Sequence, residues 1–248
     1  MPIRTLAPPS TEQNDSQAPY RPYGLLILPG DKYVLIATSW GHLDLYHLPS
    51  STLIQTFRAH SKAVKALALR PDGRGCVSGG ADGEIKEWDF EIQRQRQPSA
   101  VTTSEPSLTL VHVRTLKVDD EVTALTYSKN GSLLITALLD ASVRVFHHDT
   151  LALQSHLYGH KLPVYAVDTS DDGELLITGS EDRNIKIWGI MFGECRKSVR
   201  CQQSITNVRF MRGTHLFWSV DRDGLLRSWD ADKVSFWHCE PCCWRSRR

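Results

Sequence analysis

Residues 158–188 read YGHKLPVYAVDTSDDGELLITGSEDRNIKIW. Apolar residues alternate with polar ones on both sides of the turn Asp171-Asp172-Gly173. A second polar cluster, from Glu181 to Asn184, precedes the alternation that ends at Trp188. Alternation with a period of two, broken by Asp, Asn and Gly clusters, predicts short antiparallel strands joined by tight turns. This stretch therefore predicts one small antiparallel sheet.

Four other segments repeat this pattern. Each of the five units closes on an aromatic residue, and these residues are Tyr46, Trp88, Phe146, Trp188 and Trp229, separated by 42, 58, 42 and 41 residues. The long interval contains residues 91–107, a polar segment rich in Gln, Arg, Ser, Thr and Pro, which we predict to be a surface-loop insertion. The repeat predicts an all-β chain of about five blades, each of four antiparallel strands, over residues 20–234.

A Gly-His start, a Trp end and a repeat of about 40–45 residues are typical of WD-repeat β-propeller blades. Propellers close with typically 4–8 blades. Because the repeats stop after the fifth unit, we expect an incomplete ring. The flanking residues differ in composition, and we expect a disordered N-terminus over residues 1–19 and an irregular tail over residues 235–248.

The composition excludes several classes of protein. The 248 residues carry a formal net charge of +1, which gives no support for a surface that grips nucleic acid as a whole. The start lacks the apolar core of a signal peptide, and no apolar run approaches the roughly 18 residues of a membrane helix. The six cysteines do not form a disulfide framework. We expect an intracellular protein with no membrane contact.

Polar residues also recur at fixed offsets. The second and fourth units share spacings of 18, 4 and 6 residues in the sets His60, Ser78, Asp82, Trp88 and His160, Thr178, Asp182, Trp188. The fifth unit has Cys201 in the histidine position and keeps Ser219, Asp223 and Trp229. The third unit keeps Asp140 but has Val118 and Phe146 in the histidine and tryptophan positions.

The His–Ser/Thr–Asp sets resemble a catalytic triad in residue type only. An indole N–H, a hydroxyl, an imidazole and a carboxylate can satisfy one another's hydrogen bonds when blades stack. Active sites are seldom copied once per repeat. We therefore interpret these residues as a structural network within each blade, and we predict no catalytic, cofactor-binding or metal-binding residue, and no small-molecule substrate.

Two other groups have residue types that can carry chemistry. His238 and the cluster Cys239, Cys242 and Cys243 lack the second pair of ligands of a structural zinc site. Arg70 to Arg74 and Arg94 to Arg96 place positive charge near loops, where solvated surface charge is the simpler interpretation than an RNA contact.

The repeats resemble WD-repeat β-propellers in Gly159-His160, Asp182 and Trp188 and in the matching residues of the second unit. Longer strings, among them residues 157–164, 182–189 and 227–233, are similar to the tandem-propeller WD-repeat family of the small-subunit processome. That resemblance implies a nucleolar scaffold of ribosomal RNA processing, with other WD-repeat proteins of a large ribonucleoprotein assembly as partners. It leaves open a contact with small nucleolar or pre-ribosomal RNA. Residues from about Val234 fit neither a further strand pair nor the family, which suggests a truncated product or a gene-model error.

Two alternatives come from other functional classes. A ubiquitin-ligase substrate receptor or signalling scaffold is one, but some such receptors carry Arg two positions after the Trp-Asp pair, where this chain has Glu91 and Asp232. A propeller enzyme is the other. It would need ligands or carboxylates that converge on a central channel, and the repeated polar residues already have a role within the blades.

Overall fold

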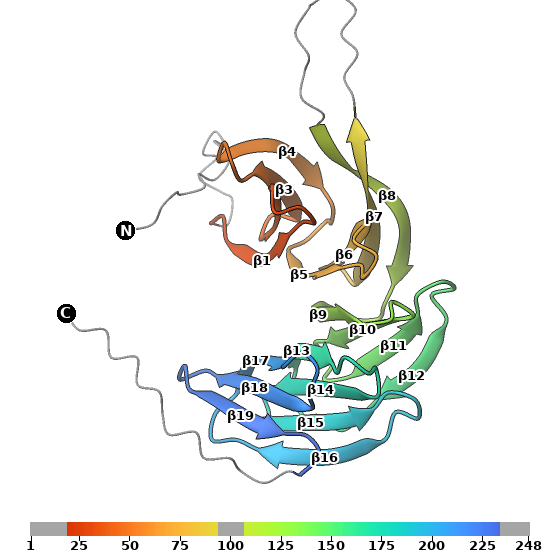
Figure 1. Cartoon of the computed structure of the whole chain (residues 1–248), viewed down its shortest axis with the longest axis vertical. Coiled ribbons are helices and arrows are strands. Elements are labelled where there is room, and N and C mark those ends of the chain that lie inside the picture. Colours follow the sequence, from red (N-terminus) through yellow and green to blue (C-terminus); the bar gives the residue numbers. More distant parts are fainter. Residues whose placement is uncertain (1–18, 94–106, 234–248) are drawn as a thin grey trace, which may run out of the picture. The chain divides into compact units, whose positions relative to one another are not determined.

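A computed structural model describes residues 19–93 and 107–233 of the chain (Figure 1). These residues form 19 β-strands and no helix, so they contain no helix long and apolar enough to cross a membrane. The predicted disordered N-terminus, apart from Pro19, and the predicted C-terminal tail lie outside the described residues. The described residues divide into two compact units, one that ends at Asp119 and one that begins at Asp120.

The first unit contains two four-stranded antiparallel sheets. The first sheet consists of β1 (Pro22–Ile27), β2 (Tyr33–Thr38), β3 (His42–His47) and β4 (Thr52–Arg58). The second consists of β5 (Val64–Leu69), β6 (Gly75–Gly80), β7 (Glu84–Gln93) and β8 (Ser107–Lys117). In each sheet the strands lie side by side in chain order, which is the meander expected of a propeller blade.

The second unit contains three sheets, again with the strands in chain order. The third sheet consists of β9 (Val122–Tyr127), β10 (Leu133–Leu138), β11 (Val143–His147) and β12 (Leu153–Leu157). The fourth consists of β13 (Val164–Thr169), β14 (Leu175–Ser180), β15 (Asn184–Gly189) and β16 (Cys195–Arg200). The fifth has three described strands, β17 (Ile205–Phe210), β18 (Leu216–Asp221) and β19 (Leu226–Asp230).

The strands form where the sequence alternates and end where turn residues allow a reversal. In β5 the side chains alternate between buried and half-buried, whereas β6, β10 and β14 are buried along their whole length because they lie inside their sheets. Gly73 and Gly173 have φ of 70° and 75° in the turns that precede β6 and β14. Glycine adopts this left-handed conformation without steric cost.

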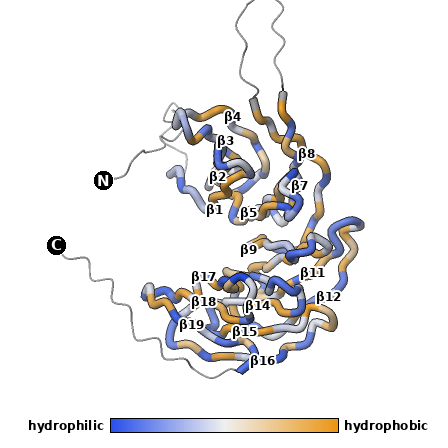
Figure 2. The backbone as a smooth tube through the Cα atoms, viewed as in Figure 1, coloured by the Kyte–Doolittle hydropathy of each residue, from blue (hydrophilic) through white to orange (hydrophobic). Residues whose placement is uncertain are grey.

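Apolar side chains fill the space between neighbouring sheets within each unit. In the first unit, one core packs Leu35, Leu43 and Leu45 of the first sheet with Val64 and Trp88 of the second. In the second unit, one core joins the third and fourth sheets and another joins the fourth and fifth. Figure 2 shows that the apolar residues fall mainly within strands and that many connecting turns are hydrophilic. The prediction of an all-β fold built from five blade-like sheets is confirmed.

The predicted boundaries of the polar insertion are wrong at both ends. Strand β7 continues to Gln93 and strand β8 begins at Ser107, with Glu91 opposite Thr109 and Ile92 opposite Leu108 in the antiparallel register. Backbone pairing thus extends into a segment whose side chains show no apolar alternation. The rest of the predicted loop, residues 94–106, lies outside the described residues.

Candidate functional site

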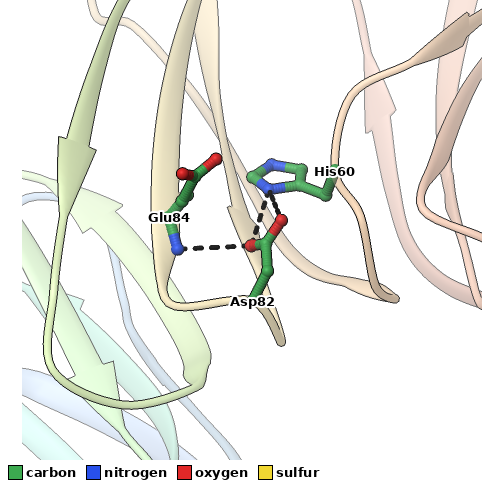
Figure 3. Close-up of side chains that lie close together, drawn as sticks. All are labelled: His60, Asp82 and Glu84. Carbon is green, nitrogen blue, oxygen red and sulfur yellow. Dashed lines mark hydrogen bonds and ion pairs between the residues drawn. The ribbon is translucent and has the colours of Figure 1, made fainter.

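The second sheet brings its four recurring residues into one hydrogen-bonded chain. His60 Nδ1 lies 3.0 Å from Asp82 Oδ1, and His60 Nε2 lies 2.8 Å from Ser78 Oγ. The indole of Trp88 donates to the same hydroxyl at 2.9 Å. Figure 3 shows the imidazole directed at the Asp82 carboxylate. The elements set this geometry, because His60 precedes β5, Ser78 lies on β6, Asp82 lies in the following turn and Trp88 lies on β7.

The fourth sheet repeats the arrangement with threonine in place of serine. His160 Nδ1 lies 3.0 Å from Asp182 Oδ2, and His160 Nε2 lies 2.7 Å from Thr178 Oγ1. The Trp188 indole donates to Thr178 Oγ1 at 2.9 Å. Asp182 also accepts the backbone N–H of Lys161 at 2.9 Å.

Burial and hydrogen bonding together set the charge state of these residues. Burial lowers the pKa of His60 and of His160 below the ordinary value of 6.5, which favours the neutral imidazole. Burial also opposes ionisation of Asp82 and Asp182. Hydrogen bonds from backbone N–H groups and from the histidines outweigh it and hold the pKa of both carboxyls below the usual range. The stable arrangement is a neutral histidine that donates from Nδ1 to a carboxylate.

The fifth sheet contains only part of the predicted network. The Trp229 indole donates to Ser219 Oγ at 2.8 Å. Asp223 is exposed, and its backbone N–H donates to Asp221 Oδ1 at 3.1 Å. The buried carboxylate of this turn is Asp221, which also accepts the N–H of Leu225 at 3.0 Å and a bond from Arg227 at 2.6 Å. The prediction that placed Asp223 in the network is therefore wrong, because Arg227 provides a cation for the earlier carboxylate.

In the third sheet, the threonine of the network lacks the histidine and tryptophan partners that it has in the fourth sheet. Thr136 occupies the strand position of Thr178 and is fully buried. Its hydroxyl has no hydrogen-bond partner among the described residues. Phe146 replaces the tryptophan, and the Asp140 carboxylate accepts a local bond from the N–H of Ser142 at 2.8 Å.

One group within these sheets has the composition of a metal site. A ligand atom from each of His60, Asp82 and Glu84 lies within 4.8 Å of the others (Figure 3). Both nitrogens of His60 are hydrogen-bonded already, and Glu84 forms ion pairs with Lys86 at 3.2 Å and with Lys117 at 3.6 Å. These donors therefore do not fit a resident cation. The other sequence candidate, His238 with Cys239, Cys242 and Cys243, lies outside the described residues.

The hydroxyls of the two complete networks are poorly placed for catalysis. Ser78 and Thr178 are fully buried, and each accepts an indole N–H while bonded to an imidazole. A catalytic nucleophile must reach a bound substrate. The arrangement can connect strands within a sheet, and its polar atoms are already used for that purpose.

A cavity of about 720 Å³ lies within the first unit, between the turns of the first and second sheets. Its apolar wall includes Leu28, Tyr33 and Phe90. On its charged wall, Arg70 donates to Asp72 at 2.8 Å and to Glu87 at 3.0 Å. These carboxylates raise the pKa of Arg70 although burial opposes the charge. The Arg70 guanidinium therefore links the turn between β5 and β6 to Glu87 on β7.

Sequence reasoning missed the polar contacts that join neighbouring sheets. Asp168 on β13 accepts a bond from Arg209 at 3.2 Å and from the backbone N–H of Phe210 at 2.8 Å. His215 lies between two carboxylates, with Nε2 2.6 Å from Asp172 and Nδ1 2.9 Å from Asp232. Comparison of offsets between repeats does not reveal these contacts, because it shows which residues occupy equivalent positions, as Asp168 and Arg209 do, and not which side chains meet.

Comparisons with known proteins agree with this architecture. Residues 17–238 match a family model described as the WDR3 second beta-propeller domain. Human WD repeat-containing protein 3 is 44% identical over 137 residues, which cover 55% of this chain and 14% of that protein. U3 small nucleolar RNA-associated protein 12 of Saccharomyces cerevisiae is 40% identical over 142 residues, 57% of this chain and 15% of that protein.

More distant matches cover more of the chain. U3 small nucleolar RNA-associated protein 21 of the same yeast is 29% identical over 175 residues, 71% of this chain and 17% of that protein. The aligned residues thus span only 14–17% of these relatives' length. A chain in the crystal structure of the mitotic checkpoint complex gives a TM-score of 0.70 at 19% identity, over 85% of this chain and 61% of that one. This last likeness is one of fold alone.

Proposed function

Since the chain belongs to the family of the WDR3 second β-propeller domain, we propose that it is a non-catalytic scaffold of small-subunit ribosome biogenesis. The names of two yeast relatives associate them with U3 small nucleolar RNA. The family resemblance seen in the sequence agrees with this membership. Its partners in the proposal are other WD-repeat proteins of a large ribonucleoprotein assembly in the nucleolus.

The non-catalytic part of the proposal rests on the hydrogen bonds within the two complete networks, in which the functional groups bond to one another. Each histidine is bonded through both nitrogens and each hydroxyl is buried. We propose that His60, Ser78, Asp82 and Trp88, with their counterparts in the fourth and fifth sheets, stabilise blades and make no contact with a substrate. Buried polar groups that satisfy one another fix the geometry of a sheet in this way.

Contact with RNA is a narrower part of the same proposal. A net charge of +1 does not indicate a surface that is cationic throughout. The proposed RNA contact is therefore local or is made through partner proteins. Within the sequence candidates for such a contact, residues 70–74 and 94–96, Arg70 is already bonded to Asp72 and Glu87, which leaves Arg74 in the first range. The second range lies outside the described residues.

Sedimentation of the tagged chain from cell extract tests the proposal. The chain should sediment in a sucrose gradient with particles that contain pre-ribosomal RNA, and a fluorescent fusion should concentrate in the nucleolus. Sedimentation as a small species, together with a diffuse cytoplasmic signal, would contradict it. The variant Asp223→Ala is a matched control, because this exposed residue lies outside both complete networks and should leave the sedimentation unchanged.

A further inference from the structure

Strands β7 and β8 continue past the sheet to which they belong (Figure 1). Among the described strands, residues 90–93 pair only with residues 107–110 of β8, because the ladder between β6 and β7 ends before them. We call these two segments the hairpin extension. Leu108 lies opposite Ile92 in the register, and alternate residues of a strand project from the same face. Phe90, Ile92 and Leu108 therefore share one face of the hairpin extension.

This face borders the cavity of about 720 Å³ in the first unit. Leu28, which follows β1, and Tyr33, which begins β2, also line the cavity, as does Gly73 in the turn between β5 and β6. The two turns are packed against each other, because a Cβ added at Gly73 would lie 3.2 Å from Pro29 Cγ. Packed turns and a paired hairpin thus form the walls without help from a ligand.

Apolar side chains of graded exposure form much of the lining. Leu28 is buried, Tyr33, Phe90 and Leu108 are half-buried, and Ile92 is 70% exposed. Pockets of roughly 300–1,000 Å³ with apolar walls and a few polar groups are typical of ligand sites. A ligand in this cavity would also remove the exposed surface of Ile92 from water, which is favourable.

Two cations at the cavity have no carboxylate partner. Lys32 and Arg74 line the cavity and are exposed, and neither forms an ion pair among the described residues. Asp72 accepts the backbone N–H of Arg74 at 2.9 Å, but Arg70 Nε donates to both of its carboxylate oxygens, at 2.8 and 2.9 Å. The side chains of Lys32 and Arg74 are therefore available to a negatively charged group.

The other carboxylates of the lining have different surroundings. Asp89 Oδ1 lies 2.8 Å from Arg70 Nη1. Asp89 and Glu91 alternate with Phe90 and Ile92 along β7, so their side chains project from the opposite face of the strand. A ligand that packs on the apolar face of the hairpin extension thus lies on the side away from these two carboxylates.

We propose that this cavity binds a peptide segment of a partner protein, with one large apolar side chain against Phe90, Ile92 and Leu108 and an adjacent carboxylate near Lys32 and Arg74. The inference deepens the proposed scaffold function and rests on it. Large side chains that enter well-packed pockets contribute most of the binding energy of protein interfaces. Charge complementarity beside such a pocket selects among partners.

An acidic peptide with an apolar side chain fits the cavity better than RNA does. Tight binding of a nucleic acid backbone requires cations that neutralise several phosphates in a row. The cavity offers two unpaired cations, and Asp72, Asp89 and Glu91 also border it. A carboxylate next to an apolar side chain requires only one local positive charge.

Fluorescence anisotropy with the purified full chain tests the proposal. The labelled probe is the peptide Gly-Ser-Asp-Phe-Asp-Ser-Gly, and two comparison peptides replace its Phe by Ser or both of its Asp residues by Asn. Ile92→Ser removes apolar surface from the cavity and should weaken binding of the first peptide roughly tenfold. Val113→Ser makes a similar change at an exposed residue of β8 that does not line the cavity, and it should leave binding unchanged.

A second pair of variants tests the charge. Lys32→Gln should weaken binding of the first peptide severalfold and reduce its advantage over the Asn peptide. Lys62→Gln changes an exposed lysine that precedes β5 and does not line the cavity, so it should alter neither quantity. Because Ile92, Lys32 and Lys62 are exposed, the melting temperature should stay the same in all three variants.

Several outcomes would overturn the proposal. They are equal binding of the three peptides, equal loss with Ile92→Ser and Val113→Ser, unchanged binding with Lys32→Gln, a dissociation constant above about 1 mM for the first peptide, and tighter binding of a uridine oligonucleotide. The assay uses pure protein. A chain that binds the peptide but does not sediment with pre-ribosomal particles would therefore contradict the proposed function alone.

Discussion

Thr136 and Thr178 hold the same position on the second strands of neighbouring sheets, and only Thr178 has hydrogen-bond partners. Thr178 Oγ1 accepts the Trp188 indole at 2.9 Å and lies 2.7 Å from His160 Nε2. The Thr136 hydroxyl is equally buried and has no partner among the described residues. The repeat thus retains a hydroxyl in a sheet where the aromatic residue is Phe146.

This pair predicts opposite effects of one substitution. Thr178→Val keeps the shape of the side chain but leaves two buried nitrogens without a partner, so the free energy of unfolding should fall by about 1–3 kcal/mol. Thr136→Val removes a hydroxyl that is not bonded and should be neutral or slightly stabilising. Urea denaturation followed by circular dichroism measures both. A similar loss in the two variants would argue against a structural role for the network.

Asp221 and Asp223 give a second matched pair. Asp221→Ala removes the acceptor of Arg227 and of two backbone N–H groups, and it should lower the free energy of unfolding by roughly 1.5–3 kcal/mol, as for bonds to charged groups. Asp223→Ala changes an exposed side chain and should cost less than about 0.5 kcal/mol. The reverse order in a thermal melt would restore Asp223 to the network.

His215 predicts a local dependence on pH. Both ring nitrogens face carboxylates, Asp172 and Asp232, which raise its pKa above the ordinary value of 6.5. Lys197 also donates to the backbone oxygen of Asp232. A group whose pKa is raised on folding contributes stability that is fully present below pH 6.5 and is lost as the pH rises through its folded value.

Hydrogen exchange can follow this loss. The N–H of Ala231 donates to the carbonyl oxygen of His215 at 3.0 Å, so its protection factor should fall as the pH rises above 6.5. His215→Gln should lower protection at pH 6 and remove this pH dependence. Protection in the wild-type chain that rises through the same range would contradict the assignment. For His60 and His160 the pH dependence of stability has the opposite sign. Their pKa is lowered on folding, so the free energy of unfolding increases as the pH rises toward 6.5.

Because the ligand atoms of His60, Asp82 and Glu84 already have partners, we predict that zinc does not stabilise the fold through these residues. Zinc would have to displace the Ser78 or Asp82 bond of His60 and the lysines of Glu84. Micromolar zinc should therefore leave the melting temperature of a variant with Cys239, Cys242 and Cys243 changed to serine unaltered. Addition of His60→Ala to that variant provides the control. A rise in melting temperature that depends on His60 would show that a cation fits here.

Much of the fold was predictable because one pattern is copied five times. The aromatic spacing located the blades, and the fixed offsets of His60, Ser78, Asp82 and Trp88 matched positions that the structure brings together. Local turn chemistry and strand alternation are properties of neighbouring residues, so a single sequence contains them. The same comparison failed at Asp223, because the choice between two carboxylates depends on where the Arg227 side chain reaches.

The contacts between sheets could not be predicted from the sequence. Nothing near Asp168 or His215 in the chain indicates their partners about 40 residues away, such as Phe210 and Asp172. The extension of β7 and β8 was missed for a related reason. Backbone hydrogen bonds continue a hairpin even where polar side chains give no alternating signal.

Affinity purification of the tagged chain, with identification of the proteins and RNA recovered, tests the scaffold role most directly. The proposal predicts enrichment of other WD-repeat proteins of the small-subunit processome together with pre-ribosomal RNA, retained in Asp223→Ala and reduced in the destabilised Thr178→Val. Recovery of a ubiquitin-ligase core in place of these components would contradict it.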